Sequence, residues 1–383
     1  MKSNAQYDLI IVGAGPVGML TAIALADRNT SICLVDPTDN ELTPKSHPMT
    51  IRQSTQTFLC AMQVWPDLQN RSHPLGQINL VHNEHFGSIH FKQTQLGYII
   101  DAAHLVKALQ KSVSQNPCIK WIRGASLRNL VEDQGSWSCK IEISEKTSKT
   151  ITAKRVIACD GVLSNICESL KTPYKKVDKT FYSAIVEVQT SNWQAGYAWQ
   201  VVMGEAIAGL IPSQKANSGH VIITSEKPLN NLDRWVEEAC QGRLGTIQTW
   251  RESGIMHSCL KMRDPMQQPG VIALGNARLA LPPIAAQGFN FAVDDIRTLA
   301  HWQKRGTWQS MDAKIWQQGW YQHRQPYAEQ LYQDMQRIWT HMTLKPSTLR
   351  DLIHSAAWSW MGCDARLQAS IQQKGQGMRA IHE

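Results

Sequence analysis

The feature that most constrains the fold is a glycine motif, Gly13-x-Gly15-x-x-Gly18, near the start of the chain. The residues before it, 7–12, form a continuous apolar and β-branched run, which predicts a buried parallel strand. The residues after it, 19–28, have the apolar spacing of a helix. We therefore expect the glycines to form the turn between a strand and the helix that packs against it.

A second apolar run, residues 31–35, ends at Asp36 and completes a strand–helix–strand unit. In such a unit the first glycine allows a tight turn, the second lets the backbone approach a pyrophosphate, and the third lets helix and strand pack closely. The helix N-terminus offers free N–H groups to the phosphates, and Asp36 is placed to accept hydrogen bonds from ribose hydroxyls. The unit predicts a dinucleotide site, and by itself it leaves open which dinucleotide binds.

Further pieces of an α/β domain are spread along the chain. Apolar patterns predict helices at 102–113 and 289–302 and buried strands at 151–159 and 271–274. Between them, residues 180–265 are rich in strand signals and include one predicted helix, 232–239. From residue 308 onward the pattern is helical. One α/β domain is therefore interrupted by a β-rich insertion and followed by a helical C-terminus.

Composition excludes several classes of protein. The formal charge of +8 permits weak attraction to anionic lipid or acidic partners, but no dense Lys/Arg run is interleaved with aromatics, so nucleic acid is not an expected partner. Nine cysteines are scattered without a C-x-x-C pair or a Cys/His cluster, so we expect neither a disulfide framework nor a metal site. Without a signal peptide or a long apolar run, we expect a cytoplasmic protein, with peripheral contact to the inner membrane as an alternative.

Two later segments indicate which dinucleotide the chain binds. Asp160-Gly161 follows one buried strand, and Gly275-Asn276 follows another and opens a loop. The loop then carries the remaining residues of interest, Pro283, Gln287, Gly288 and Asn290. With these motifs the chain resembles the class A flavoprotein monooxygenases, which are single-component aromatic hydroxylases. Within that group it looks most similar to the ubiquinone-biosynthesis hydroxylases.

The resemblance implies FAD as the cofactor and NAD(P)H as a transient reductant. It assigns the ADP half of FAD to Gly13, Gly15, Pro16, Gly18 and Asp36. Asp160 and Gly161 would help to bind FAD and are linked to the pyrophosphate of the reductant. Gly275 and Asn276 would meet the ribityl and pyrophosphate portion.

The loop from Pro283 to Asn290 would run along the isoalloxazine ring, with Gln287, Gly288 and Asn290 among its contacts. A helix that starts near Phe289 would direct its positive end at the flavin and stabilise negative charge on the reduced ring. The only candidate catalytic group is the backbone carbonyl of Pro283, because a phenol activates its own ring.

The resemblance also implies the fold class: α/β, a discontinuous Rossmann-like FAD-binding domain with an inserted β-sheet substrate domain and a helical C-terminus. We expect the FAD-binding domain at 1–72, 98–178 and 268–335, the substrate domain at 73–97 and 179–267, and the helical segment at 336–383. In that last segment an apolar face is a candidate contact with a membrane or a partner subunit; it comprises Trp358, Trp360, Met361, Leu367 and Ile371.

Four positions depart from the family pattern. The arginine that follows the second strand falls on His47, with Arg52 nearby. The histidine before the loop proline is Pro282, and the first glycine of the G-Q-G motif is Ala286. The arginine after the Asp-Gly pair is replaced by Cys167. These changes leave FAD binding expected and put reductant docking and substrate geometry in question.

The expected function is hydroxylation of a polyprenylated phenol in ubiquinone biosynthesis, with NAD(P)H and O2, through a flavin C4a-hydroperoxide. Other quinone-biosynthesis proteins are candidate partners. Two alternatives stay open. One is a hydroxylase of a different aromatic compound, and the other is a non-catalytic FAD-binding subunit of a quinone-biosynthesis complex, which the four departures would suit.

Overall fold

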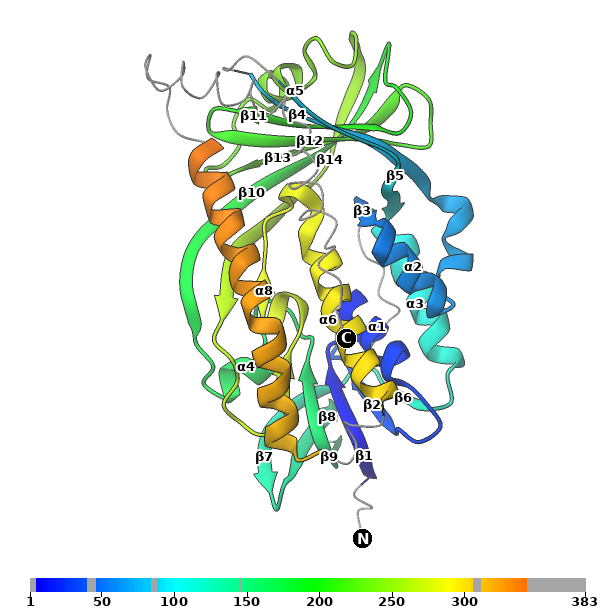
Figure 1. Ribbon diagram of the computed structural model, residues 1–383, viewed down its shortest axis with the longest axis vertical. Coiled ribbons are helices and arrows are strands. Elements are labelled where there is room, and N and C mark those ends of the chain that lie inside the picture. The colour runs from blue at the N-terminus through cyan, green and yellow to red at the C-terminus, as the bar shows by residue number, and fades with distance from the viewer. Residues whose placement is uncertain (1–4, 40–45, 84–87, 145–146, 306–310, 343–383) are drawn as a thin grey trace.

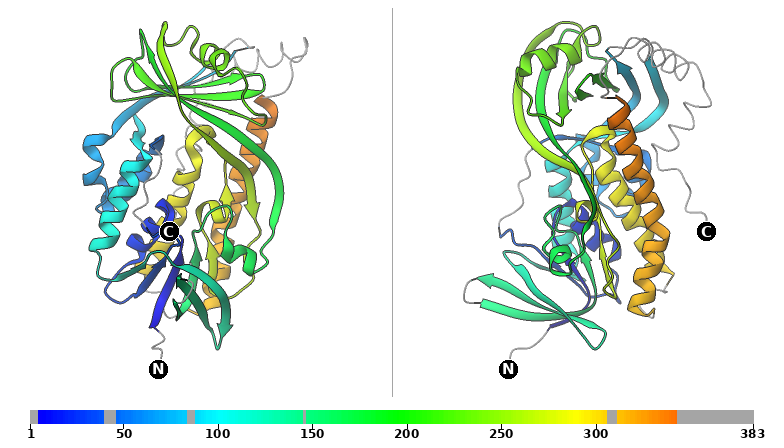
Figure 2. Two further views of the ribbon diagram at one scale, coloured as in Figure 1. Left: turned by 180° about the vertical axis from the view of Figure 1, so that it is seen from behind. Right: turned by 90° about the vertical axis from the view of Figure 1, so that its left-hand side faces the viewer.

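The computed structural model describes residues 5–39, 46–83, 88–144, 147–305 and 311–342. Two sheets lie at opposite ends of the molecule, with helices between and beside them (Figures 1 and 2). The first sheet contains the N-terminal strand, and the second contains most of the middle of the chain. The helices α6 and α8 run along the molecule between the two ends (Figure 1).

The first sheet has seven strands, in the order β6-β2-β1-β9-β8-β7, with β15 also paired to β9. Its parallel part consists of β1 (Ala5–Val12), β2 (Ile32–Val35), β6 (Ile119–Ile122), β9 (Thr147–Ala158) and β15 (Val271–Ala273). Its antiparallel part consists of β7 (Ser126–Asp133) and β8 (Ser136–Ser144). The parallel strands are apolar because helices and other segments bury them on both faces.

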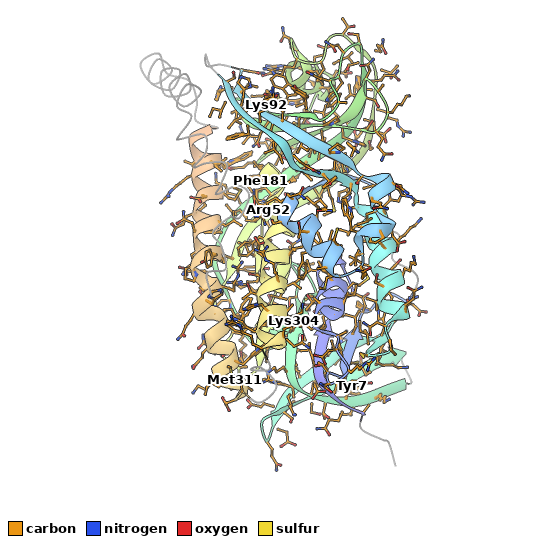
Figure 3. All side chains as sticks on the ribbon, turned by 45° about the vertical axis from the view of Figure 1, so that its right-hand side comes forward. Tyr7, Arg52, Lys92, Phe181, Lys304 and Met311 are labelled. Atoms are coloured by element: carbon orange, nitrogen blue, oxygen red, sulfur yellow. The ribbon has the colours of Figure 1, made fainter. Side chains whose placement is uncertain are left out.

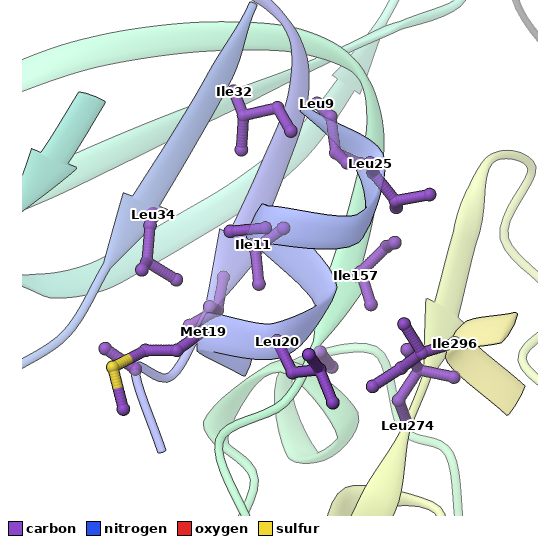
Figure 4. Close-up of a cluster of buried hydrophobic side chains, with 14 of the residues drawn as sticks. Leu9, Ile11, Met19, Leu20, Leu25, Ile32, Leu34, Ile157, Leu274 and Ile296 are labelled. Atoms are coloured by element: carbon purple, nitrogen blue, oxygen red, sulfur yellow. The ribbon is translucent and has the colours of Figure 1, made fainter. Parts of the chain in front are cut away.

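The core of this sheet explains why the N-terminal segment folds as predicted. Leu9, Ile10 and Ile11 of β1 have no exposed surface. The helix α1 (Pro16–Leu25) packs beside them, and its Leu20 lies near Ile157, Leu274 and Ile296 (Figure 4). Segments that are far apart in the sequence therefore share one hydrophobic core.

The second sheet has nine strands in the order β16-β14-β10-β13-β12-β11-β4-β5-β3. They are β3 (Pro48–Arg52), β4 (His73–His82), β5 (Ser88–Asp101), β10 (Tyr174–Thr190), β11 (Tyr197–Met203), β12 (Ala206–Pro212), β13 (Ser218–Ser225), β14 (Ile247–Arg263) and β16 (Leu279–Ala280). The long strands β10 and β14 extend from this sheet toward the parallel one (Figure 1). They connect the two ends of the molecule.

The remaining helices surround these sheets. The α-helices are α2 (Gln53–Ala61), α3 (Ala102–Gln115), α4 (Asn165–Ser169), α5 (Leu232–Cys240), α6 (Gln287–Lys304) and α8 (Ala313–Met342). The 3-10 helices are η1 (Trp65–Asp67), η2 (Gln69–Arg71), η3 (Gly275–Ala277) and η4 (Ile284–Ala286). Within the described part of the chain, no helix has both the length and the apolar character that a membrane span requires.

The predicted fold class is confirmed: a discontinuous α/β domain, an inserted β-sheet region and a helical C-terminal region are all present. Most predicted elements occur within a few residues of their expected bounds. The helix α2 and the strand β3 before it were not predicted, since that segment has few strongly apolar positions. The domain limits stay a prediction, and most of the segment 336–383, including Trp358 and its apolar neighbours, lies outside the described residues.

Candidate cofactor site

The glycine loop closes tightly against its own strand and helix. Gly13 has φ +98°, in the left-handed region that favours glycine, and its amide donates to the carbonyl of Val35 at 2.8 Å. A Cβ on Gly18 would lie 1.8 Å from the carbonyl oxygen of Gly13. Gly18 therefore serves the packing of α1 on the loop.

Gly15 differs from its two partners, because a Cβ built on it meets nothing within 4 Å. It stands before Pro16, the first residue of α1, and no side chain caps this helix. The first N–H groups of α1 and its positive dipole end are thus free beside open space. This is the arrangement that a phosphate group requires.

Asp36 lies at the end of β2 and is 8% exposed. Its carboxylate accepts hydrogen bonds from the amides of Ala14, at 2.6 Å, and Thr38, at 2.8 Å. The two bonds fix the carboxylate beside the glycine loop. Each oxygen keeps a second lone pair with which to accept a ribose hydroxyl.

Two further loops meet the glycine loop because their strands end side by side. Val12 of β1 is paired with Ala158 of β9, and Ala158 is paired with Ala273 of β15. Asp160-Gly161 and Gly275-Asn276 follow the last two strands directly. In open parallel sheets, ligands bind outside the carboxyl ends of the strands. The structure therefore brings the predicted motifs to one edge of the sheet.

The Asp160-Gly161 turn has space and an unpaired polar atom. Gly161 has φ +83°, and a Cβ on it would meet nothing within 4 Å. Asp160 accepts from the amide of Ile166 through one carboxylate oxygen, while the other, Oδ1, is buried without a hydrogen-bond partner among the described residues. Burial raises the pKa of this carboxyl, and hydrogen bonds from Ser164 and the following backbone oppose the rise.

The third loop begins at η3. Gly275 has φ +57° and packs against Val17 of α1, whereas Asn276 is exposed. The loop then passes the buried Pro282 and the half-buried Pro283, forms η4 and enters α6 at Gln287. No side chain caps α6, and Gly288 in its first turn has open space where a Cβ would lie. A second free helix N-terminus thus lies on this loop.

Ala286, which stands where the family has glycine, is in the left-handed conformation, with φ +51° and ψ +37°. This conformation costs an alanine roughly 1 kcal/mol more than a glycine. We expect Ala286→Gly to raise the free energy of unfolding by about 0.5–1 kcal/mol, measured by urea denaturation. Ala300→Gly, at an ordinary helical position of α6, should lower it. A destabilising Ala286→Gly would show that the left-handed residue carries no strain.

Asn290 is buried, and its side chain is fully engaged within the protein. Its amide oxygen accepts from the amide of Arg52, at 3.0 Å, and from Oγ1 of Thr55, at 2.7 Å. Its NH2 group donates to the carbonyls of Thr50, at 3.0 Å, and Ala286, at 2.7 Å. These four bonds use all its capacity. Asn290 therefore positions β3 and α2 against the start of α6 rather than offering its side chain to a ligand.

Arg52, rather than His47, contacts α6 through its side chain. Arg52 stands at the N-cap position of α2 without a side-chain capping bond, and its Nη2 lies 2.7 Å from Oδ2 of Asp294. It is 9% exposed and lies at the level where the helices meet the large sheet (Figure 3). His47 precedes β3, and its carbonyl accepts from the amide of Ala102. From the sequence, Arg52 was noted only as a residue near position 47. Its ion pair with Asp294 of α6 was not predicted.

Cys167 is buried in α4, where its thiol contacts the carbonyl of Ala277 at 3.6 Å. Burial raises its pKa to about 11, so the thiol is protonated at neutral pH. A guanidinium nevertheless lies beside this helix. Arg263 of β14 donates to the carbonyl of Thr172, at 2.6 Å, and to Glu168, at 2.9 Å. A positive charge is thus present beside α4, supplied by β14.

The residues present fit a bound dinucleotide. Open space at Gly15 and Gly161 leaves room for backbone approach, Asp160 keeps an unpaired oxygen, and α1 and α6 offer uncapped N-termini. An adenine dinucleotide with a second, flavin-bearing half would extend from α1 along η3 toward α6. The residue contacts with FAD that the sequence suggested remain predictions.

Comparisons with known proteins agree with this site. The family model described as "FAD binding domain" matches residues 6–303. The chain is 21% identical to ubiquinone hydroxylase UbiM of Neisseria meningitidis, over 91% of this chain and 81% of the relative. It is 22% identical to 3-demethoxyubiquinol 3-hydroxylase of Escherichia coli, over 78% of this chain and 79% of the relative.

Among solved structures, p-nitrophenol 4-monooxygenase PnpA from Pseudomonas putida has the same fold, with a TM-score of 0.75 and 14% identity. The alignment covers 99% of this chain and 100% of that one. These matches confirm the predicted class, an FAD-dependent hydroxylase. The chain belongs to the FAD-binding domain family, and FAD is its cofactor.

Proposed function

We propose that this chain hydroxylates a polyprenylated phenol in ubiquinone biosynthesis, with NAD(P)H and O2 as cosubstrates. The observation that carries the proposal is the uncapped N-terminus of α6, reached through η4, which packs against β12 of the large sheet. FAD, when bound, would supply the redox chemistry, namely hydride acceptance from NAD(P)H and activation of O2. Relatives named ubiquinone hydroxylases support the choice of pathway.

The residues around η4 are suited to a water-excluding role. Leu279, Ile284 and Phe291 are at most 9% exposed and pack with Phe181 and Ile207 of the large sheet. An apolar wall of this kind limits side reactions with water. The dipole of α6 would stabilise negative charge that develops on a reduced flavin near this N-terminus. We propose that Pro283 contributes through its backbone carbonyl and that no side chain acts as an acid or base.

A second candidate is a non-catalytic FAD-binding subunit of a quinone-biosynthesis complex. It is favoured by Pro282, which is buried at the position where the family has histidine. Proline has no group that can move a proton or donate a hydrogen bond. The two candidates predict different behaviour toward NAD(P)H. A hydroxylase of another aromatic compound is the third candidate, and it differs only in substrate.

The test is the visible spectrum of the purified protein, followed by anaerobic titration with NADPH and NADH, with and without a prenylated phenol. We expect a bound flavin whose absorbance bleaches faster when the phenol is present, and a hydroxylated product once O2 is admitted. A bound flavin that neither nicotinamide reduces would favour the non-catalytic subunit. Acceleration by simple phenols but not by prenylated ones would favour the third candidate.

A further inference from the structure

One face of the large sheet packs against η4 and α8, and the opposite face is covered by α5. The covered face carries Val201, Ala208, Leu210, Val221 and Ile223, which pack with α5. The face toward the cofactor site carries Val202 and Ile207, which pack with Ile284 of η4 and with α8. Since side chains alternate along a strand, the residues between those of the covered face belong to the face toward the cofactor site.

Five such residues form one row across neighbouring strands. Gln200 of β11 is paired with Gly209 of β12, which is paired with Ile222 of β13. Ile222 is paired with Ile185 of β10, and Ile185 with Gly254 of β14. The strands β11 to β14 and β10 lie side by side in the upper sheet of Figure 1. The row therefore includes β12, the strand on which η4 packs.

The two glycines leave this row open. A Cβ on Gly209 or on Gly254 would meet nothing within 4 Å. Glycine weakens a strand interior, and one reason for its presence there is close approach of another molecule. Ile185 and Ile222, between the two glycines, are each 8% exposed and belong to none of the packed hydrophobic clusters of the described residues. The row is thus an apolar strip with open space at its two glycines.

Gln200 supplies a polar group at one end of the strip. It is half-buried, and its side-chain amide makes no hydrogen bond with the described residues. The amide is therefore not fully buried and is available to a ligand. The distance from β12 to β14 is about 14 Å, from three strand spacings. Such a strip can hold an aromatic ring and the first units of an apolar tail.

We propose that Gln200 and Gly209 determine specificity for the aromatic ring, with Gln200 bonded to a ring hydroxyl. The polyprenyl tail then extends over Ile222 and Ile185 toward Gly254. This inference rests on the proposed function, since it takes a prenylated phenol as the substrate. It assigns the polar end of the row to the ring and the apolar strip to the tail.

The experiment measures the dissociation constants of a short- and a long-tailed prenylated phenol by calorimetry, and steady-state turnover in parallel. Gly209→Leu fills the space over which the ring lies, so both ligands should bind about tenfold or more weakly. Gly254→Leu should weaken only the long-tailed ligand. Ser253→Leu is the matched control, because it adds the same side chain at an exposed neighbouring position of β14 and should change neither constant. All three variants should retain FAD and wild-type melting temperatures.

Gln200 is tested through selectivity. The wild type should prefer the phenol over its O-methyl ether by about tenfold, because the ether cannot donate to the amide oxygen. Gln200→Leu should remove that preference. If the wild type binds the phenols while Gly209→Leu binds them equally well, or Gln200→Leu keeps the preference, the inference is overturned and the proposed function stands. If the wild type binds and turns over no prenylated phenol, the proposed function fails and the inference fails with it.

Discussion

Replacement of Gly15 by valine is expected to abolish FAD binding while leaving the fold of the protein intact. The space around Gly15 is empty in the structure, so the added side chain meets no protein atom. It stands instead where the backbone of α1 approaches the pyrophosphate. We expect the purified variant to be colourless and the dissociation constant for FAD to rise by about 100-fold or more, since a displaced phosphate loses several charge-assisted hydrogen bonds.

Gly18→Ala provides the contrast. Its Cβ would lie 1.8 Å from the carbonyl oxygen of Gly13, so α1 or the loop must move. We expect it to lose about 1–3 kcal/mol of unfolding free energy as well as FAD, because the clashing oxygen belongs to backbone that cannot move easily. The melting temperature of the apoprotein separates the two variants: unchanged for Gly15→Val and lowered for Gly18→Ala. If Gly15→Val were yellow and bound FAD with wild-type affinity, the phosphate groups of FAD could not lie at this loop.

The N-terminal unit could be predicted because its determinants are local. The alternation of a buried strand, three spaced glycines, a helix and Asp36 spans about thirty residues, and each part has its own physical requirement. The discontinuity of the α/β domain was also predictable, because β9 and β15 are apolar and end in Asp160 and Gly275. Those ends are brought together by the pairing of strands that are more than 100 residues apart. This pairing was expected only from the resemblance to a known family.

The contacts of Arg52 and Asn290 could not be predicted in the same way. The side chain of Asn290 makes its hydrogen bonds with Thr50, Arg52, Thr55 and Ala286, from segments about 240 residues away and from its own loop. No local pattern encodes such partners. The segment 46–61 also has a weak apolar signal, so neither β3 nor α2 was expected. The row through Gly209 could not be predicted either, because its members come from five strands whose order only the folded sheet defines.

A buried cluster of charged side chains joins the cofactor loop to the C-terminal helix. Asp295 of α6 accepts from Arg278, at 3.1 Å, and from Arg324 of α8, at 2.6 Å. Asp295 is completely buried and Arg278 is 2% exposed. Arg278 follows η3, and its amide donates to the carbonyl of Gly275. Burial lowers the pKa of the Arg278 guanidinium, and the charge of Asp295 opposes the change. The carboxylate is therefore what makes two buried guanidinium groups tolerable.

Asp295→Asn keeps the shape of the side chain and removes its charge, so both arginines would remain buried without an anion. Removal of one partner from a buried ion pair costs about 3–5 kcal/mol, and we expect a loss of that size in urea denaturation of the apoprotein. Asp334→Asn, which disrupts the exposed pair with Arg337 on α8, should cost less than about 0.5 kcal/mol. Because Asp295 also holds η3 through Arg278, FAD affinity should fall with stability in the first variant and stay unchanged in the second. If Asp295→Asn cost no more than the control, solvent or a rearranged side chain would be compensating the two charges, and the cluster would not be the link between η3 and α8.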